Sequence, residues 1–513
     1  MPKTPRAILV IFCLLLTAPA IGGWLGLDVF TKNIENRNLA VRPEFSWSRK
    51  FPRLYQDYFN DSFGLRNTLI SLNYLFRYEL LGVSPSNQVL AGKEGWLYYT
   101  GDGEIADCRG ITQFTERQLH RWLQIHLLKR DWLAQRNIRY LIVIVPNKST
   151  IYPEYLPAGY GRVRPRSGLD DFIDYIRNHS DLQIVDLRSR LFEEKKAHDL
   201  YYRTDTHWNN KGAFVGYQEI LKPLISWFPE ITPLPPDDFE IMKYQRGGGD
   251  LSAMIGGQEF MEEEYLDFIP KNAFTAIVSE KNTAPRDALT MTKSEKNLPG
   301  IVVFRDSFFT PLIPLISEHF SVSRYIWNYW DSKTPIEDIL DRYQPKIVME
   351  ERVERFLKNT DAFGDGLPPY LEAAAISKAL SSEQAQEIPL DQISAGFQAE
   401  LKCGNAELLV EAKGLDPQLL IPTSLMPERL SHGVLLQVEV ESPAESHLQL
   451  FYKTRESPAY SERMSVRAPL NKGFNQVNLL IFDQEIVGQL RLDPGNVPGE
   501  YTIKKMTFFP LGG

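Results

Sequence analysis

The chain has 513 residues, about three times the usual ~150-residue domain length, so we expect two or three folding units. Apolar residues make up 43% and charged residues 24% of it, a composition that supports buried cores and excludes a wholly disordered chain. The formal net charge of −8 disfavours nonspecific nucleic-acid binding, which needs a basic face. No nucleic-acid partner is therefore expected.

Near the N-terminus, residues 7–27 carry no charged side chain and are numerous enough to cross a bilayer. Lys3 and Arg6 precede this stretch and Asp28 follows it, which predicts export of everything after residue 28. We predict that residues 1–28 form a single-pass transmembrane anchor. A cleaved signal is the alternative, because residues 18–20 (Ala-Pro-Ala) resemble a cleavage site.

The three cysteines are too few for a disulfide framework. Cys13 lies in the apolar stretch, which leaves Cys108 and Cys403 as either a disulfide pair or two inert thiols. The sequence has neither zinc-ligand spacing nor a CxxC motif.

Residues 29–360 alternate between helical and strand patterns. A helix at 114–137 begins with a capping box of Thr115 and Gln118, and the continuous apolar run 140–145 follows it. Further strands are predicted at 182–187, 301–304, 322–327 and 346–349, and helices at 169–178, 210–222 (ended or kinked by Pro223), 311–320 and 335–342. This order predicts a three-layer α/β domain with a parallel sheet, whose ligand sites lie at the carboxyl ends of strands.

The period changes after residue 360. Residues 361–398 read as a linker, and from about 400 apolar and polar residues alternate, as at 436–441 and 448–452. We predict that residues 399–513 form an all-β sandwich.

The segment Asp205-Thr-His207 carries a base and a group that can orient it. On an extended backbone both side chains point to one side, so the carboxylate can accept from one imidazole nitrogen and leave the other as a general base. Asn209 or Asn210 can cap the helix that follows. A chance acid-x-His triplet is the alternative; a metal site is weaker, because no third His or Cys stands nearby at ligand spacing.

Ser307 is the candidate nucleophile. It follows the predicted strand 301–304 directly and precedes a helix, so its hydroxyl would stand above the sheet edge and its backbone N–H could help to bind an oxyanion. A Ser that merely caps this helix is the alternative. Two further Asp-Ser pairs, at Ser62 and Ser332, lie in a helical pattern and in a turn, which disfavours both as nucleophiles.

Two other features have plainer interpretations beside their functional ones. Residues 247–250 (Gly-Gly-Gly-Asp) lack the Lys-Ser/Thr of a phosphate loop and are better explained as a flexible turn. The cluster of Arg162, Arg164 and Arg166 could bind an acidic glycan or form a solvated basic loop.

These motifs together resemble a known family. Residues 204–208 (TDTHW), 304–308 (FRDSF), 145–148 (VPNK), 151–157 (IYPEYLP) and 95–98 (GWLY) are similar to the alginate O-acetyltransferase family of AlgJ and AlgX, which has an SGNH-hydrolase-like fold. The resemblance covers about residues 45–360 and implies that Asp205, His207 and Ser307 are the catalytic triad. Arg305 stands where this fold often has glycine, which puts the oxyanion hole in question.

The resemblance implies a periplasmic O-acetyltransferase at the inner membrane that acetylates an exopolysaccharide through an acetyl-serine intermediate. It also implies a membrane acetyl-donor protein of the MBOAT type as partner, and no metal or organic cofactor is needed. The candidate substrate contacts are Lys148, Trp208, Arg305, Tyr325, Arg162, Arg164 and Arg166.

A family member with a carbohydrate-binding C-terminal sandwich has a similar layout. Residues 331–513 contain no Trp, so glycan stacking there would rest on Tyr452, Tyr460, Phe474 or Tyr501, and a structural or docking role is the alternative. Two other functions remain open for the whole chain: an acetylesterase that uses the same triad, and a non-catalytic glycan-binding or scaffold protein of a secretion complex.

Overall fold

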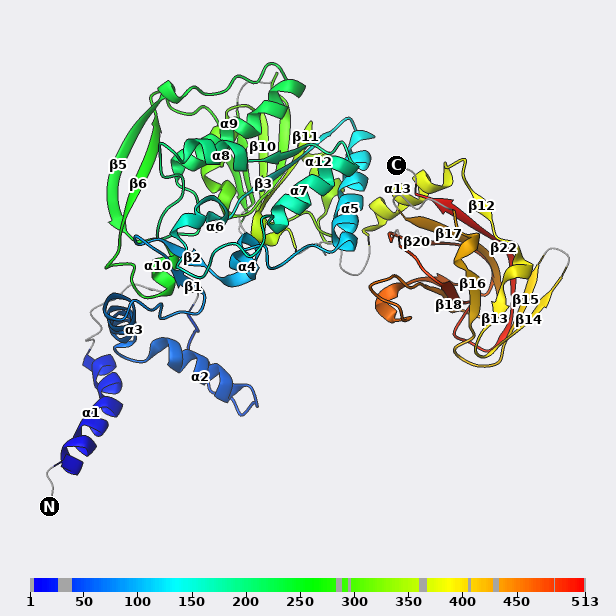
Figure 1. Cartoon of the computed structure of the whole chain (residues 1–513), viewed down its shortest axis with the longest axis horizontal. Coiled ribbons are helices and arrows are strands. Elements are labelled where there is room, and N and C mark those ends of the chain that lie inside the picture. Colours follow the sequence, from blue (N-terminus) through cyan, green and yellow to red (C-terminus); the bar gives the residue numbers. More distant parts are fainter. Residues whose placement is uncertain are drawn as a thin grey trace.

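The computed structural model describes residues 4–25, 39–282, 288–293, 297–358, 367–404, 407–427, 433–483 and 485–511. Residues 1–3 and 26–28 of the predicted anchor and 361–366 of the predicted linker lie outside these ranges. Figure 1 shows N-terminal helices, an α/β body and a β-rich C-terminal part in chain order.

The α/β body is built on a seven-stranded sheet with the order β4-β3-β11-β9-β10-β8-β7. Its strands are β3 (Arg139–Val145), β4 (Ile184–Asp186), β7 (Ile277–Asn282), β8 (Ala288–Thr292), β9 (Gly300–Phe304), β10 (Val322–Ile326) and β11 (Ile347–Val353). Pairing is parallel from β4 to β10 and antiparallel where β8 joins β10 and β7. The prediction of a parallel sheet was therefore wrong for this edge: too few residues connect β7 and β8 for a crossover, which leaves a hairpin.

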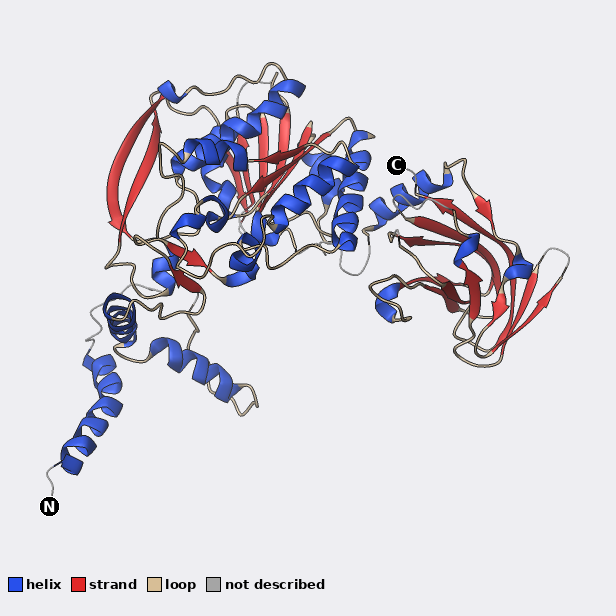
Figure 2. Cartoon of the chain, viewed as in Figure 1, coloured by secondary structure: helices blue, strands red, loops and turns tan. Residues whose placement is uncertain are grey.

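Helices cover both faces of this sheet (Figure 2). Leu141, Val143 and Val145 of β3 pack in one core with α8 (Arg188–Glu194), α9 (Asn210–Trp227) and α11 (Ile313–Ser317). The alternate residues Tyr140, Ile142 and Ile144 pack in a second core with α5 (Glu116–Ala134), α7 (Gly168–His179) and α12 (Ile336–Tyr343). The continuous apolar run thus predicted a doubly covered strand correctly.

The capping residues in the sequence predicted the starts of two helices correctly. Thr115 and Gln118 form the capping box of α5, and Asn209 caps α9 by accepting from the Gly212 N–H at 2.9 Å. The helix α9 continues past Pro223 to Trp227, so Pro223 does not end it, and the alternative that Pro223 kinks it stays a prediction. Leu221 and Leu224 on either side are fully buried, and their packing offsets the hydrogen bond that proline cannot make.

The N-terminal part consists of α1 (Thr4–Leu25), α2 (Phe51–Ser62), α3 (Arg66–Tyr74) and a π-helix (Leu75–Leu80), with α1 directed away from the α/β body in Figure 1. Among the residues described, no helix combines the length and apolarity needed to cross a membrane. The transmembrane helix predicted at residues 7–27 is therefore not confirmed.

Several elements of the α/β body were not predicted from the sequence. They are the hairpins β1 (Val89–Ala91) with β2 (Leu97–Tyr99) and β5 (Phe239–Gly247) with β6 (Glu262–Pro270), and the short helices α4 (Glu104–Cys108), α6 (Lys148–Ile151) and α10 (Asp250–Met254). The turn between β5 and α10 matters for the site described below.

The C-terminal part contains two antiparallel sheets with one core between them. One sheet has the order β14 (Ala399–Cys403), β15 (Leu408–Ala412), β22 (Gly499–Pro510), β17 (Val434–Ser442), β20 (Gly473–Ile481), and β12 (Gln386–Glu387) pairs with β22. The other has the order β13 (Ser394–Ala395), β16 (Leu419–Pro422), β21 (Gln489–Asp493), β18 (Ser446–Phe451), β19 (Ser465–Leu470). The range 361–398 thus holds β12, β13 and α13 (Pro369–Leu380).

Two of the four aromatic residues considered for glycan stacking are accessible. Phe474 is exposed and Tyr460 is partly exposed, whereas Tyr452 and Tyr501 are buried in the sandwich. Carbohydrate binding by this part of the chain stays a prediction. The three cysteines are free, with Cys108 buried and Cys403 exposed, so the alternative of a Cys108–Cys403 disulfide is not observed.

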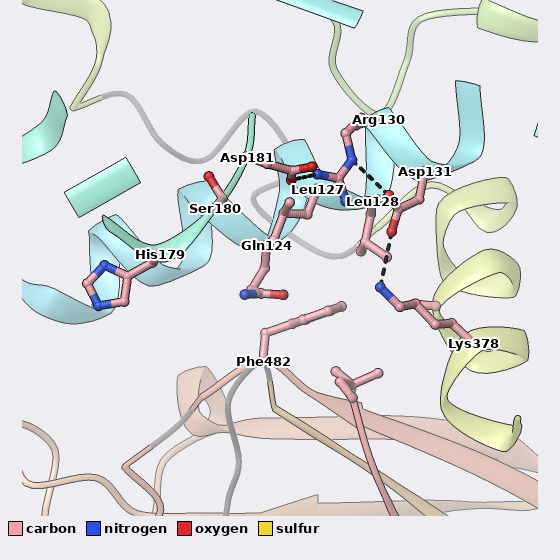
Figure 3. A pocket seen from close by; sticks show the side chains of 12 residues that line it. Gln124, Leu127, Leu128, Arg130, Asp131, His179, Ser180, Asp181, Lys378 and Phe482 are labelled. Atoms are coloured by element: carbon pink, nitrogen blue, oxygen red, sulfur yellow. Dashed lines mark hydrogen bonds and ion pairs between the residues drawn. The ribbon is translucent and has the colours of Figure 1, made fainter. Parts of the chain in front are cut away.

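A pocket of about 180 Å³ lies where α5 and α7 meet α13 and the sandwich (Figure 3). A chain of ion pairs runs along it from Asp181 to Arg130, from Arg130 to Asp131, and from Asp131 to Lys378 of α13. The side chains of Phe482 and Leu511 line it from the sandwich. Its lining includes none of the predicted catalytic residues. The pocket lies at the junction between the α/β body and the sandwich and is separate from the candidate catalytic residues.

The buried ion pair of Lys129 and Glu350 allows a stability test. Neither side chain is exposed, and Glu350 also accepts from the Tyr140 hydroxyl and from Arg352. Lys129→Met removes one of the two cations that pair with the buried Glu350 carboxylate and leaves only Arg352, so it should lower the free energy of unfolding by up to about 3–5 kcal/mol. In urea unfolding the matched Lys413→Met, which breaks a solvent-exposed pair with Glu411, should leave the midpoint close to that of the wild type. Equal unfolding midpoints for the two variants would contradict this prediction.

Candidate active site

Three neighbouring parallel strands, β3, β11 and β9, end at the same edge of the sheet. Asn147 and Lys148 follow β3, Arg355 follows β11, and Ser307 follows β9. Carboxyl ends of parallel strands are where α/β folds place their ligand sites. This edge is therefore the candidate site.

Ser307 is the first residue of a 3₁₀ helix, Ser307–Leu312, and is partly exposed. Asp306 caps that helix by accepting from the Phe308 N–H at 2.9 Å. The other Asp306 oxygen accepts from the Tyr329 hydroxyl at 3.1 Å and from the Val353 N–H at 2.9 Å. Asp306 thus fixes the strand-to-helix corner on which Ser307 stands.

Asp205 and His207 lie on a loop before α9 that buried charges hold in place. The Lys148 ammonium donates to the carbonyls of Tyr202, Arg203 and Asp205 at 3.2, 3.1 and 2.6 Å. From the opposite side, the buried Glu263 carboxylate accepts from the N–H groups of Arg203 and Thr204 at 3.2 and 2.6 Å. Both ends of the loop backbone are therefore anchored by side chains from distant segments.

The structure brings the three predicted catalytic residues into one hydrogen-bonded chain. His207 Nδ1 lies 2.7 Å from Asp205 Oδ1, and His207 Nε2 lies 2.7 Å from Ser307 Oγ. The carboxylate fixes the ring, since Asp205 Oδ1 also accepts from the His207 N–H at 2.9 Å. This is the geometry of a nucleophile, a base and a group that orients the base.

Electrostatics favour an ionised Asp205 and a basic His207. Burial opposes ionisation of Asp205, but its hydrogen bond to His207 and the charge of His207 lower the pKa of Asp205 to about 2. Burial also acts against protonated His207, yet Asp205 and Asp250 raise the pKa of His207 above its usual 6.5. The Arg355 guanidinium opposes this rise.

Asp250 belongs to the site, but the sequence did not predict it, because residues 247–250 indicated only a flexible turn. Its carboxylate accepts from the Thr206 N–H at 2.7 Å and the Thr206 hydroxyl at 2.6 Å, and its N–H donates to Asp205 Oδ2 at 2.9 Å. The acid after three glycines was the only signal. Asp205, His207 and Asp250 offer ligand atoms within 4.8 Å of one another, but their hydrogen bonds account for the cluster without a metal.

Arg355 is a second residue that was not predicted. Its guanidinium lies 5.4 Å from the ring of Phe308, next to the nucleophile, and donates to Glu104 and to the Asn147 side-chain oxygen, both at 3.4 Å. The sequence pattern held no motif around it, because its place follows from the register of β11 beside β9.

The predicted substrate contacts have other partners in the structure. The Lys148 ammonium donates to the loop carbonyls described above. The Trp208 indole N–H donates to the Phe308 carbonyl at 2.9 Å. Arg305 is buried over the Trp327 ring and donates to the Thr310 hydroxyl, and its own N–H donates to the Ile326 carbonyl. Tyr325 is fully buried and hydrogen-bonds with Ser317, so it has no surface to offer a glycan.

The three arginines of residues 162–166 also have protein partners. Arg162 and Arg164 donate to the carbonyls of Pro165 and Gly110, and Arg166 pairs with Asp171 and Asp174. Contact of this cluster with an acidic glycan stays a prediction.

The competing serines lie in the settings that their sequence contexts indicate. Ser62 ends α2 and donates to the Tyr58 carbonyl at 2.7 Å, and Ser332 lies in a turn after Asp331. Of the three Asp-Ser serines, Ser307 is the one whose hydroxyl meets His207.

Comparison with known proteins identifies a family to which this chain is similar. Residues 89–296 match the SGNH hydrolase-like domain of the acetyltransferase AlgX, a range that includes Asp205 and His207 and ends before Ser307. A "Probable alginate O-acetylase AlgJ" of Pseudomonas putida is 30% identical over 135 residues, which are 26% of this chain and 32% of that protein. The match thus spans about a third of that relative's length.

Longer alignments are weaker in identity. A "Probable alginate O-acetylase AlgJ" of Pseudomonas fluorescens is 23% identical over 397 residues, 74% of this chain and 93% of that protein. The solved O-acetyltransferase domain of Pseudomonas putida AlgJ is 19% identical, with 56% of this chain and 99% of that domain covered at a TM-score of 0.38. The predicted resemblance is confirmed: this chain is similar to the AlgJ and AlgX family of alginate O-acetyltransferases, with an SGNH hydrolase-like domain.

Proposed function

We propose that this protein is an O-acetyltransferase that uses Ser307 as nucleophile to move an acetyl group onto a hydroxyl of an exported polysaccharide. The observation that carries the proposal is the hydrogen-bonded chain Asp205–His207–Ser307 at the carboxyl edge of the sheet. The family match supports acetyl transfer as the reaction, and the name of the AlgJ relatives supports a polysaccharide acceptor.

The first half of the reaction acetylates Ser307. His207 Nε2 takes the proton of Ser307 Oγ as the oxygen attacks the acetyl carbonyl, and Asp205 stabilises the imidazolium that forms. The tetrahedral intermediate then expels the donor's leaving group, which receives the proton from His207. The products are acetyl-Ser307 and the protonated leaving group of the donor.

The second half runs the same steps in reverse with a sugar. His207 takes the proton of an acceptor hydroxyl, whose oxygen attacks acetyl-Ser307, and returns that proton to Ser307 Oγ when the ester bond to the enzyme breaks. The acetyl group is now on the sugar and the enzyme is unchanged. If water attacks instead of a sugar, the same residues give an esterase, so the acceptor decides the reaction class.

An oxyanion forms in both halves and needs hydrogen-bond donors. The neighbouring backbone donors are engaged: the N–H of Arg305 with Ile326, of Asp306 with Glu351, and of Phe308 with Asp306. We assign the oxyanion contact to the Ser307 N–H. The position of Arg305, where related folds often have glycine, already uses its N–H within the sheet.

We infer the setting of the reaction from the family. The acceptor is an exported polysaccharide, so the catalytic body would work in the periplasm. An acetyl donor must then be supplied across the inner membrane, and a membrane acetyl-transfer protein of the MBOAT type is the proposed partner.

The serine is the first test. Ser307→Ala should lower the rate on a chromogenic acetyl ester by about 10⁴- to 10⁶-fold, since a triad loses most of its rate with its nucleophile. Ser62→Ala and Ser332→Ala, at the other two Asp-Ser pairs, should keep the full rate. An unchanged rate in Ser307→Ala would sink the catalytic proposal and leave a glycan-binding or scaffold protein.

The acceptor is the second test. With an acetyl ester and an oligosaccharide of uronic acids, mass spectrometry should find acetylated oligosaccharide that is absent with Ser307→Ala. Release of acetate alone, with no acetylated sugar over a range of acceptors, would make the protein an esterase.

The pH profile tests the base. His207 must be neutral to accept a proton, and its pKa is raised, so kcat/KM should rise with pH through a midpoint above 6.5. A midpoint below this value would show that Asp205 and Asp250 do not act on His207 as the geometry implies.

A substitution at Gly249 tests how precisely the Asp205 carboxylate must be positioned. A Cβ at this position would lie 2.4 Å from Asp205 Cβ and 2.5 Å from Asp205 Oδ2, so Gly249→Ala must displace the carboxylate. We expect a loss of about 10²-fold in kcat, as for other misplacements of about 1 Å. Gly161→Ala, where a Cβ meets nothing within 4 Å, is the control and should be as active as the wild type.

A further inference from the structure

A second carboxylate stands behind the base, and the triad alone does not explain it. Asp250 Oδ2 lies 3.8 Å from His207 Nδ1, on the same side of the ring as Asp205 Oδ1 at 2.7 Å. Asp250 and Asp205 also contact each other, through the Asp250 N–H. Two carboxylates this close to one imidazole repel each other when both are ionised, so placing them together costs free energy of folding.

Thr206 connects Asp250 to the imidazole. Its hydroxyl donates to Asp250 Oδ2 at 2.6 Å and lies 3.2 Å from His207 Nδ1, while its N–H donates to Asp250 Oδ1. The residue between Asp205 and His207 is thus tied to Asp250 through both its backbone and its side chain. A shift of Asp250 must move the Asp-x-His loop.

The charges around His207 come from several elements. Asp205 lies on its own loop, Asp250 on α10, and Arg355 follows β11. Behind the two acids, the Lys148 ammonium from α6 and the Glu263 carboxylate from β6 act on one another and on the loop. The two carboxylates favour a protonated ring, and Arg355 is the cation that opposes them.

We propose that Asp250 is a positioning residue of this site, which holds Asp205 and His207 through Thr206 and stabilises the imidazolium with its charge. The proposal rests on the proposed function, because the imidazolium forms when His207 takes the proton of Ser307. Asp250 touches neither Ser307 nor a reacting atom in this arrangement, so it acts through its neighbours.

The charge and the hydrogen bonds of Asp250 can be separated by substitution. Asp250→Asn keeps the size of the side chain and an oxygen for the Thr206 N–H, and it removes the negative charge together with the oxygen that accepts from the Thr206 hydroxyl. Thr206→Val keeps the carboxylate and removes the hydroxyl between Asp250 and the imidazole. Glu262→Gln, at an exposed residue that starts β6, removes the same charge from a nearby segment and is the control.

In the kinetic arm we expect Asp250→Asn to move the midpoint of the acid limb of kcat/KM to lower pH by about one unit. It should lower kcat by about tenfold with little change in KM, because the lost interaction belongs to the transition state. Thr206→Val should lower kcat and leave the midpoint in place. A loss of kcat without any movement of the midpoint in Asp250→Asn would reduce Asp250 to a structural contact and overturn the proposal.

The second arm does not depend on turnover. In the Ser307→Ala protein, NMR titration of the His207 ring, assigned with His207→Gln, should give a pKa about one unit lower after Asp250→Asn is added. Glu262→Gln should leave it unchanged, and equal thermal unfolding temperatures show that the fold is intact. If Asp250→Asn does not fold, a wild-type kcat in Thr206→Val would overturn the positioning role.

The two arms separate the two proposals. If Ser307→Ala keeps its rate but the His207 pKa falls with Asp250→Asn, the proposed function fails and the coupling of Asp250 to His207 stands. If Ser307→Ala is inactive and the pKa does not move, the proposed function stands and the role of Asp250 fails.

Discussion

The site depends on the contacts that hold the loop of residues 203–207, a segment with neither helix nor strand. Its backbone groups need partners, and a buried cation and a buried carboxylate supply them: Lys148 for the carbonyls and Glu263 for the N–H groups. Burial lowers the pKa of Lys148 to about 8, although nearby acids oppose the shift. Its three hydrogen bonds hold the loop carbonyls on one buried cation.

Sequence reasoning could identify the parts of the fold that local chemistry controls. Apolar runs gave the doubly covered strands β3 and β9, and capping signals gave the starts of α5 and α9. Because β9 runs straight into Ser307 and Asn209 fixes the helix after His207, the same local signals also selected the residues that meet at 2.7 Å. Neither segment alone showed that they meet; that follows from the sheet order.

Sequence reasoning failed where a long-range contact decides the structure. The pairing of β7 and β8 at the sheet edge depends on which strand is free to accept them, and no local pattern states this. Asp250 likewise looks like part of a turn until its partner Thr206, 44 residues away, is placed beside it. Tyr325 is the opposite case: it was named as a candidate substrate contact, whereas its ring is fully buried and its hydroxyl is satisfied inside the core by Ser317.

The net charge of the chain gives little guide to the field at the site. The formal value of −8 averages over the surface, where ion pairs such as Arg166 with Asp171 are screened by solvent. Around His207 the order of charges is fixed instead: two carboxylates on the Nδ1 side, Ser307 on the Nε2 side, and Arg355 as the opposing cation. Since these groups are held by hydrogen bonds and partly shielded from water, they need little reorganisation when a proton moves to the ring. That fixed arrangement makes the imidazole a stronger base than histidine in water, while the bond to Asp205 keeps Nε2 directed at the serine.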